Sequence, residues 1–282
     1  MNFFGGAIKK SAVFDIAILG VPYDEKSSYL RGPAKGPPAI REASTEEELN
    51  AWTELGVDLK KQVSMADLGD MNVEGSFSDV CSRIESRVSL LLEEDAVPIV
   101  LGGDHSISLP VVRAFSRKHN PLDILHFDAH PDLYEELYGD RYSHACPFAR
   151  ILEEGLAANL VQVGVRSITG EHRDKAAEYG VRMIEMKDMQ ENMGLVFENP
   201  LYISFDMDAL DPAFAPGVSH REPGGLSTRQ VINMLHALKA DIAGMDLVEV
   251  NPVRDVSGIT ASAAAKIILE VCGKIALDTR SG

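Results

Sequence analysis

Eight short apolar runs, each long enough for one strand, alternate along the chain with longer amphipathic windows. Most runs are continuously apolar, which is typical of strands in a parallel sheet that is covered on both faces. The predicted strands are 15–19, 63–68, 97–101, 122–127, 160–163, 181–185, 201–205 and 242–247, and the predicted helices are 77–94, 108–119, 143–155, 227–240 and 260–277. This alternation predicts βαβ crossovers and a three-layer α/β/α domain.

The chain has 282 residues and a hydrophobic content of 45%, which is enough for a substantial core. No repeat, low-complexity run or linker rich in Pro, Gly or Ser divides it, so we expect a single domain over residues 1–282. No apolar run reaches the length of about eighteen residues that a membrane-spanning helix needs. We therefore expect no membrane span.

The formal net charge of −16 argues against nucleic acid or an anionic membrane as a partner, and it suits a cationic substrate or divalent metals. Residues 1–10 lack the ordered basic, apolar and small-residue regions of a secretory signal. Cys81, Cys146 and Cys272 are odd in number, far apart and without CxxC spacing, which favours a reduced, cytoplasmic protein. Cys146 is either a redox-sensitive thiol or a small packed side chain.

Polar side chains follow three of the predicted strands at their carboxyl ends. These segments are GGDHS at 102–106, DAHPD at 128–132 and FDMD at 205–208. The carboxyl ends of parallel strands meet at one edge of the sheet, and alternate residues of an extended segment such as DAHPD point to one face. We therefore expect six side chains to converge there: His105, Asp128, His130, Asp132, Asp206 and Asp208.

The chemistry of this set indicates which metal it binds. Each segment alone is compatible with a turn or a structural histidine, but three of them after three buried strands favour a metal centre. Four carboxylates, two imidazoles and no thiolate are too hard a set for structural zinc and too rich for one magnesium ion. Such a set suits manganese, with cobalt, nickel or iron as competitors. Four carboxylates balance about four positive charges, so two divalent ions are expected.

The combination of GGDHS, DAHPD and SFDMDALDP (204–212) resembles the ureohydrolase family, which comprises arginases, agmatinases and related guanidino hydrolases. The resemblance covers nearly the whole chain, from LGVP at 19–22 to the last helix. The segments YSHA at 142–145, VSHREPGG at 218–225 and VEVNP at 248–252 resemble most the plant-type arginases and agmatinase-like members. The resemblance implies an eight-stranded, mostly parallel sheet, urea release from a guanidino group, and a homotrimer or homohexamer.

The resemblance also implies two Mn²⁺ ions per subunit and a ligand set for each. It assigns His105, Asp128, Asp132 and Asp206 to one ion, and Asp128, His130, Asp206 and Asp208 to the other. Asp128 and Asp206 would then bridge the two ions. Asp104 and Asp211 are interpreted as groups that orient ligands rather than as ligands themselves.

Two further residues are expected to act on the substrate. Spacing alone favours a surface position for His144, but the resemblance implies that it is the proton shuttle. Glu249 follows the last predicted strand and lies between Val248 and Val250. Its carboxylate is expected to bind the guanidinium through charge-assisted hydrogen bonds and to hold it in place for attack.

The substrate is less strongly indicated than the reaction. Tyr134 stands where animal-type arginases have an Asn that helps to receive the amino-acid carboxylate, and Glu135 and Glu136 follow it. Acidic residues at the pocket mouth would repel a carboxylate and attract a terminal amine, which favours agmatine and the product putrescine. His220 departs from the Thr found in many agmatinases and animal-type arginases. L-arginine is the alternative, and guanidino acids or formimidoylglutamate come third.

Two other classes of protein compete with this interpretation. A binuclear phosphatase also uses loops rich in Asp and His, but it needs basic groups for phosphate, and only Arg166 and Arg254 are candidates. A metal-dependent structural or regulatory subunit could retain the fold without activity. The presence of all six ligand positions together with His144 and Glu249 argues against that reading.

Overall fold

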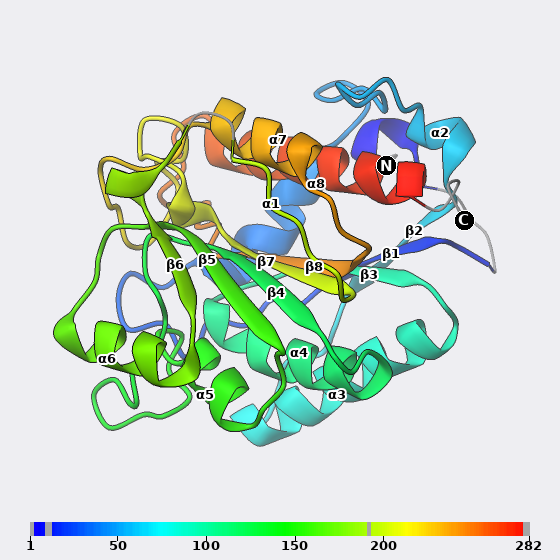
Figure 1. Ribbon diagram of the computed structural model, residues 1–282. Coiled ribbons are helices and arrows are strands. Elements are labelled where there is room, and N and C mark those ends of the chain that lie inside the picture. Colours follow the sequence, from blue (N-terminus) through cyan, green and yellow to red (C-terminus); the bar gives the residue numbers. More distant parts are fainter. Residues whose placement is uncertain (1–2, 9–12, 191–192, 279–282) are drawn as a thin grey trace.

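The computed structural model describes residues 3–8, 13–190 and 193–278, and its centre is one parallel sheet of eight strands (Figure 1). The strands are β1 (Ile16–Gly20), β2 (Met65–Asp70), β3 (Val97–Leu101), β4 (Asp123–Phe127), β5 (Asn159–Val165), β6 (Arg182–Glu185), β7 (Leu201–Asp206) and β8 (Ile242–Val248). Their order across the sheet is β2-β1-β3-β8-β7-β4-β5-β6, and every neighbouring pair is parallel. All eight predicted strands are confirmed to within two residues at each end.

Helices cover both faces of the sheet, which confirms the predicted three layers (Figure 1). The helices are α1 (Gly36–Glu42), α2 (Leu59–Gln62), α3 (Phe77–Glu93), α4 (Ser108–Lys118), α5 (Pro147–Glu153), α6 (Gly170–Tyr179), α7 (Thr228–Ala237) and α8 (Ile259–Asp278). Helices α1, α2, α7 and α8 lie on one face, and α3 to α6 lie on the other. None of the described helices is long and apolar enough to cross a bilayer.

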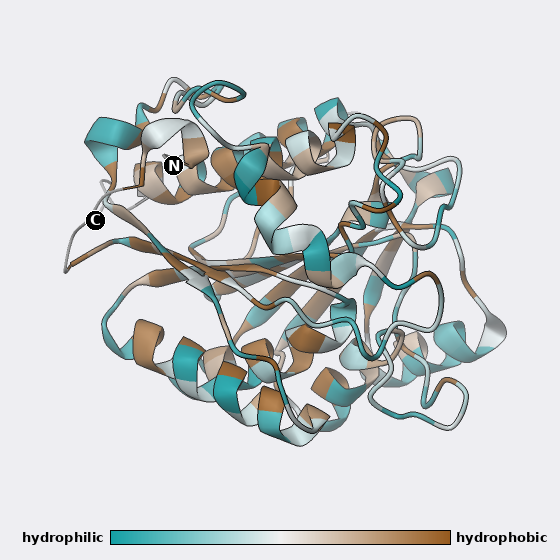
Figure 2. Cartoon of the chain, turned by 180° about the vertical axis from the view of Figure 1, so that it is seen from behind, coloured by the Kyte–Doolittle hydropathy of each residue, from teal (hydrophilic) through white to brown (hydrophobic). Residues whose placement is uncertain are grey.

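Burial explains why the sequence pattern located the strands so well. In β1, β4, β7 and β8 every residue is buried, because both faces of these strands contact helices. Figure 2 shows these strands as largely hydrophobic bands between helices whose colours alternate between hydrophobic and hydrophilic. The edge strand β6 is only partly buried.

The helix predictions are less complete than the strand predictions. The predicted helix 143–155 begins only at Pro147, because residues 143–146 form the turn that carries His144. The predicted helix 227–240 ends at Ala237, and its start has a capping box between Ser227 and Gln230. Helices α1, α2 and α6 were not predicted, since α1 and α2 are short and α6 is mostly polar.

The order of the strands determines where a site forms. Strands β3, β8, β7 and β4 are consecutive neighbours in the middle of the sheet, although the chain visits β3 and β4 first. In an open parallel sheet, ligands bind at the carboxyl edge where the order of connections reverses. The three segments predicted to carry metal ligands follow β3, β4 and β7, and Glu249 follows β8.

Candidate metal centre

The first group of predicted ligands surrounds the ring of His105, which lies four residues after the end of β3. Its Nδ1 lies 3.3 Å from Oδ2 of Asp128, 3.1 Å from Oδ2 of Asp132 and 3.2 Å from Oδ2 of Asp206. All four side chains are buried. Three strand ends therefore bring one imidazole nitrogen and three carboxylate oxygens to a single point.

The second group surrounds His130. Its Nδ1 lies 3.3 Å from Oδ1 of Asp128 and 3.1 Å from Oδ2 of Asp208. Asp128 thus directs Oδ2 to the first group and Oδ1 to the second, which is the arrangement of a bridging carboxylate. Asp206 contacts the first group through Oδ2, while its Oδ1 accepts a hydrogen bond of 2.7 Å from the main-chain N–H of Asp208.

The donor atoms fit divalent ions. Nδ1 of His105 is buried and has no hydrogen-bond partner of adequate geometry, which is costly unless the nitrogen binds an ion. Ligand atoms bound at about 2.1 Å in octahedral geometry are about 3 Å apart, close to the separations around His105. The buried oxygens and imidazoles of both groups also match the mixed hard and intermediate ligands of manganese-type sites.

Several buried carboxylates lie close together in the two groups, and their pKa values show the electrostatic cost. Burial, together with the charges of Asp208 and Asp128, raises the pKa of Asp206 well above its usual value. Burial and the charge of Asp128 raise the pKa of Asp208 to about 6. Asp128 is the exception, because its interactions with His105, His126 and His130 outweigh its burial and lower its pKa. A divalent ion would replace the protons that otherwise relieve this repulsion.

Two residues of the site have strained backbones. Asp132 has φ of 52° and Glu249 has φ of 64°, a left-handed conformation that costs a residue with a Cβ about 1–3 kcal/mol. The main-chain N–H of Glu249 donates to the carbonyl of Gly103, which fixes its position beside the GGDHS segment. The chain therefore tolerates strain at two positions predicted to be functional.

A buried chain of hydrogen bonds holds the ring of His105. Its Nε2 lies 3.0 Å from Oγ of Ser204, and that hydroxyl donates to Asp246 at 2.7 Å. Since the Ser204 proton is used on Asp246, its oxygen accepts from Nε2–H of His105. The other ring nitrogen, Nδ1, is thereby left unprotonated for a metal ion.

His126 is a site residue that sequence reasoning missed. The Gln162 amide donates to Nδ1 of His126 at 2.9 Å and to the carbonyl of Pro131 at 2.7 Å. Nε2–H of His126 must then donate to Oδ2 of Asp128, 2.9 Å away. His126 therefore orients Asp128 and is not itself a ligand. Its place in β4, two residues before Asp128, was the available signal.

His144 and Glu249 form a buried pair next to the first group. Nδ1 of His144 lies 2.8 Å from Oε1 of Glu249, which also accepts a hydrogen bond of 3.1 Å from the main-chain N–H of His105. Oε2 of Glu249 is buried and has no hydrogen-bond partner. Burial alone would lower the pKa of His144, but the hydrogen bond and charge of Glu249 raise it to about 9.

A family comparison agrees with this geometry. The sequence model of a protein family, described as "Arginase family", matches residues 14–273 of this chain. The chain belongs to the arginase family. Arginase 1, mitochondrial, of Arabidopsis thaliana is 49% identical over 92% of this chain and 80% of its own length. The solved arginase of Medicago truncatula is 44% identical, with a TM-score of 0.86 over 93% of this chain and 88% of that structure.

More distant members of the arginase family carry other names. Agmatinase, mitochondrial, of Gallus gallus is 37% identical over 91% of this chain and 80% of its own length. The recognition of a ureohydrolase from three motifs is confirmed, and so is an enzyme class that hydrolyses guanidino C–N bonds. Identity is higher to the arginases above than to this agmatinase.

The predicted specificity residues lie at the rim of the centre. The ring of His220 is 5.4 Å from His144, 5.5 Å from Tyr29 and 5.9 Å from His130, measured between ring centroids. Tyr134 lies edge-on against His172, with the centroids 4.1 Å apart. His220 therefore lies close to the predicted ligand His130, whereas the ring contact of Tyr134 is with His172.

Glu135 does not provide the charge expected of it. Its carboxylate forms ion pairs with Arg141, with Lys175 at 2.8 Å and with Arg150 at 3.3 Å. Three cations thus neutralise it. The electrostatic argument for agmatine therefore loses Glu135, because tertiary ion pairs are not visible in a sequence.

Asp104 and Asp211 support loops. Asp104 accepts from the main-chain N–H groups of Ser106 at 3.1 Å and Lys26 at 2.9 Å. Asp211 accepts from the main-chain N–H groups of Gly224 at 2.6 Å and Gly225 at 3.1 Å. They act on the chain around the site, and neither carboxylate contacts a predicted ligand side chain in the described hydrogen bonds.

Arg166 is not available for phosphate. Its guanidinium donates to main-chain carbonyls on three sides, including those of Asp208 at 2.7 Å and Glu222 at 2.6 Å. Arg254 is exposed. Of the two candidates for phosphate binding, Arg166 is therefore engaged by the main chain and Arg254 lies at the surface.

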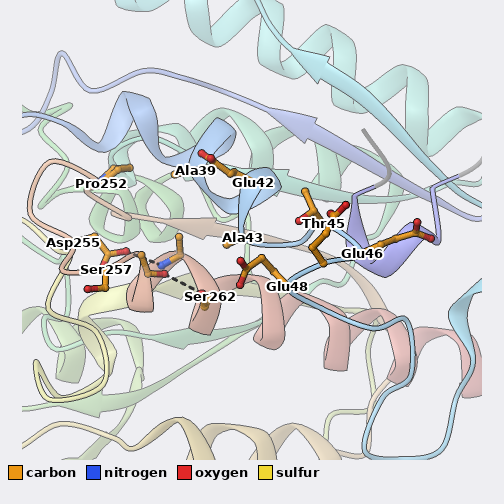
Figure 3. Close-up of a pocket in the computed structure, with 13 residues that line it drawn as sticks. Ala39, Glu42, Ala43, Thr45, Glu46, Glu48, Pro252, Asp255, Ser257 and Ser262 are labelled. Carbon is orange, nitrogen blue, oxygen red and sulfur yellow. Dashed lines mark hydrogen bonds between the residues drawn. The ribbon is translucent and has the colours of Figure 1, made fainter.

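A hollow of about 850 Å³ lies elsewhere, between α1 and the start of α8 (Figure 3). Its labelled acidic side chains include Glu42, Glu46, Glu48 and Asp255. None of the predicted ligands, nor His144 or Glu249, lines it. Its size therefore says nothing about the substrate of the metal centre.

Proposed function

We propose that this protein is a manganese-dependent hydrolase that converts L-arginine and water into L-ornithine and urea. The observation that carries the proposal is the convergence of His105, Asp128 and Asp206 beside the unpartnered Oε2 of Glu249. Imidazole and carboxylate oxygens bind divalent ions, and a free buried carboxylate oxygen binds a guanidinium.

The ligand roles follow the two groups of side chains. The first ion would be held by His105, Asp128, Asp132 and Asp206, and the second by Asp128, His130, Asp206 and Asp208. When bound, the ions supply water of lowered pKa, which the poorly electrophilic guanidinium carbon requires at neutral pH.

The remaining residues bind the substrate and move a proton. Glu249 would accept hydrogen bonds from the guanidinium and fix its plane against the metal centre. The reaction consumes one water, whose oxygen becomes the carbonyl oxygen of urea and whose two hydrogens both pass to the departing amine. The amine can therefore leave only if a proton is delivered to its nitrogen. His144 is the group that holds that proton, since it is buried next to Glu249.

L-arginine is preferred to agmatine for two reasons. The chain is 49% identical to a plant arginase and 37% identical to a vertebrate agmatinase. The carboxylate of Glu135, on which the expectation of agmatine partly depended, is neutralised by three cations. We also propose a homotrimer or homohexamer, in keeping with the family resemblance, and the cytoplasmic location expected from the cysteines.

Agmatine is the second candidate because of Glu222. Its Oε1 lies 3.5 Å from Nε2 of His130, and the side chain is 37% exposed, so a carboxylate does face the rim of the site. Agmatine, with a cation at each end, would benefit from it.

One comparison tests the proposal. Urea release by the Mn²⁺-loaded protein is measured with L-arginine, agmatine and short guanidino acids side by side. We expect the highest kcat/KM for L-arginine. A higher kcat/KM for agmatine would select the second candidate, and no urea from any of these compounds would reject both.

A further inference from the structure

Both ring nitrogens of His144 already have protein partners. Nδ1 faces Oε1 of Glu249 at 2.8 Å. Nε2 lies 2.8 Å from Oγ of Ser28 and 3.2 Å from the main-chain N of the same residue. Nδ1 is thus engaged by Glu249 and Nε2 by Ser28, so a proton that reaches or leaves Nε2 passes the Ser28 hydroxyl.

The main-chain N–H and the hydroxyl of Ser28 differ in the protonation states of His144 that they allow. A main-chain N–H can only donate, so it requires a lone pair on Nε2 and places the proton of the neutral ring on Nδ1. The Nδ1–H then donates to Glu249. The Ser28 hydroxyl can donate to Nε2 or accept from it, so it tolerates both protonation states of the ring.

The main chain around Ser28 is anchored on both sides. The main-chain N–H of Lys26 donates to Asp104 at 2.9 Å, and the carbonyl of Leu30 accepts from Nδ2 of Asn251 at 2.8 Å. The carbonyl of Lys26 also accepts a hydrogen bond of 3.3 Å from the main-chain N–H of His144. Ser28 itself is exposed, so its hydroxyl joins a buried ring to the open side of the site.

We propose that Ser28 is a positioning residue and a proton relay for His144. The inference rests on the proposed hydrolase function. One proton moves onto Oγ of Ser28 while the hydroxyl proton moves to Nε2, and the reverse pair of transfers delivers a proton to the departing amine. No proton is gained or lost overall, as the hydrolysis of a guanidinium to urea and an ammonium requires.

Kinetics of three variants test the relay. Ser28→Ala keeps the main-chain N–H and removes the hydroxyl, so we expect kcat to fall about tenfold or more while KM stays within about twofold. Ser28→Thr restores a hydroxyl and should recover most of kcat. Ser27→Ala is the matched control, because the Ser27 hydroxyl faces Asp104 at 3.4 Å, and its kcat should change less than about twofold.

A second measurement tests the positioning without any turnover. Neutron crystallography of the metal-loaded protein, at a pH where the ring is neutral, locates the deuterium on His144. We expect it on Nδ1 in the wild type and in Ser28→Ala. Deuterium on Nε2 of the neutral wild-type ring would overturn the positioning role.

The outcomes distinguish a failure of the Ser28 relay from a failure of the proposed hydrolase function. Full kcat in Ser28→Ala, or a loss that Ser28→Thr does not recover, overturns the relay. A wild type that releases no urea rejects the hydrolase function and the relay with it, whereas the neutron result still decides whether Ser28 positions the ring.

Discussion

Glu249 accepts hydrogen bonds at one oxygen, Oε1, from Nδ1 of His144 at 2.8 Å and from the main-chain N–H of His105 at 3.1 Å. Its second oxygen is buried without a partner. Glu249 therefore connects the predicted proton shuttle to the predicted metal centre and has one oxygen without a hydrogen-bond partner. Its left-handed φ of 64° allows the side chain to turn inward directly after β8.

The first prediction concerns substrate capture. Glu249→Gln keeps an acceptor for His105 and His144 but removes the negative charge that binds the guanidinium. Losing one charge of a buried, hydrogen-bonded pair costs about 2 kcal/mol or more, so KM should rise about thirtyfold. Steady-state urea release measures KM, and elemental analysis measures the metal. We expect the metal content to be unchanged, and a loss of metal would make Glu249 a ligand.

The second prediction concerns pH. Glu249 raises the pKa of His144 to about 9, whereas the main-chain N–H of Ser28 favours the neutral ring. The ring accepts a proton only when neutral, so kcat should increase as pH rises towards about 9. In Glu249→Gln the same increase should occur at lower pH, because the charge that favours the imidazolium is gone. Profiles of kcat between pH 6 and 10 show the shift, and coincident profiles would exclude His144 as the titrating group.

The third prediction separates bridging from terminal ligands. Asp128 contacts both groups, whereas Asp132 contacts only the group of His105. Asp128→Asn should therefore lose both ions, and Asp132→Asn should retain one. Metal content per chain after dialysis against metal-free buffer gives the answer. Equal loss in the two variants would contradict the assignment of Asp128 as the bridge.

The extent of the sequence-based success has a physical basis. The fold followed from continuously apolar strands, since residues such as Ile124, Phe127 and Phe205 are buried by helices on both faces. The convergence of the predicted ligands followed because His105 and Asp128 lie just past the carboxyl ends of such strands. Local sequence thus determined which edge of the sheet each side chain reached.

Interactions between distant segments were not predictable in the same way. In the sequence, His126 is one residue of an apolar strand. Its role depends on Gln162, 36 positions away, which hydrogen-bonds to its ring. Ser28 lies 116 positions from His144, and nothing in its own loop marks it. The neutralisation of Glu135 likewise depends on Lys175, 40 positions away. These contacts arise from tertiary packing, which spacing rules do not describe.

The fourth prediction concerns stability and metal. In the metal-free protein, the pKa of Asp208 is raised to about 6, so this group makes the folded state less stable as pH rises from about 4 to about 6. Mn²⁺ relieves that repulsion. At one hundred times its dissociation constant, Mn²⁺ should stabilise the fold by about 3 kcal/mol, or roughly 5 °C or more in Tm.

Thermal unfolding with and without Mn²⁺ measures this gain, and it should be larger at pH 7 than at pH 5. Mg²⁺ is the matched control, because the imidazoles of His105 and His130 suit manganese better. A gain in Tm that is the same at both pH values would show that the buried carboxylates do not control metal binding.

The fifth prediction concerns the choice of substrate and compares two glutamates. Glu135 is neutralised by Arg141, Arg150 and Lys175, so Glu135→Gln should leave the ratio of kcat/KM for agmatine and L-arginine within about twofold. Glu222 has no lysine or arginine partner in the described part of the chain.

Agmatine carries two positive charges, whereas L-arginine carries a compensating carboxylate. Glu222→Gln should therefore lower kcat/KM severalfold more for agmatine than for L-arginine. Urea release with both substrates, at low ionic strength where such charges act most strongly, decides between the glutamates. If Glu135→Gln shifted the ratio and Glu222→Gln did not, Glu135 would face the substrate in the working enzyme, and the argument for agmatine from the acidic loop would regain its basis.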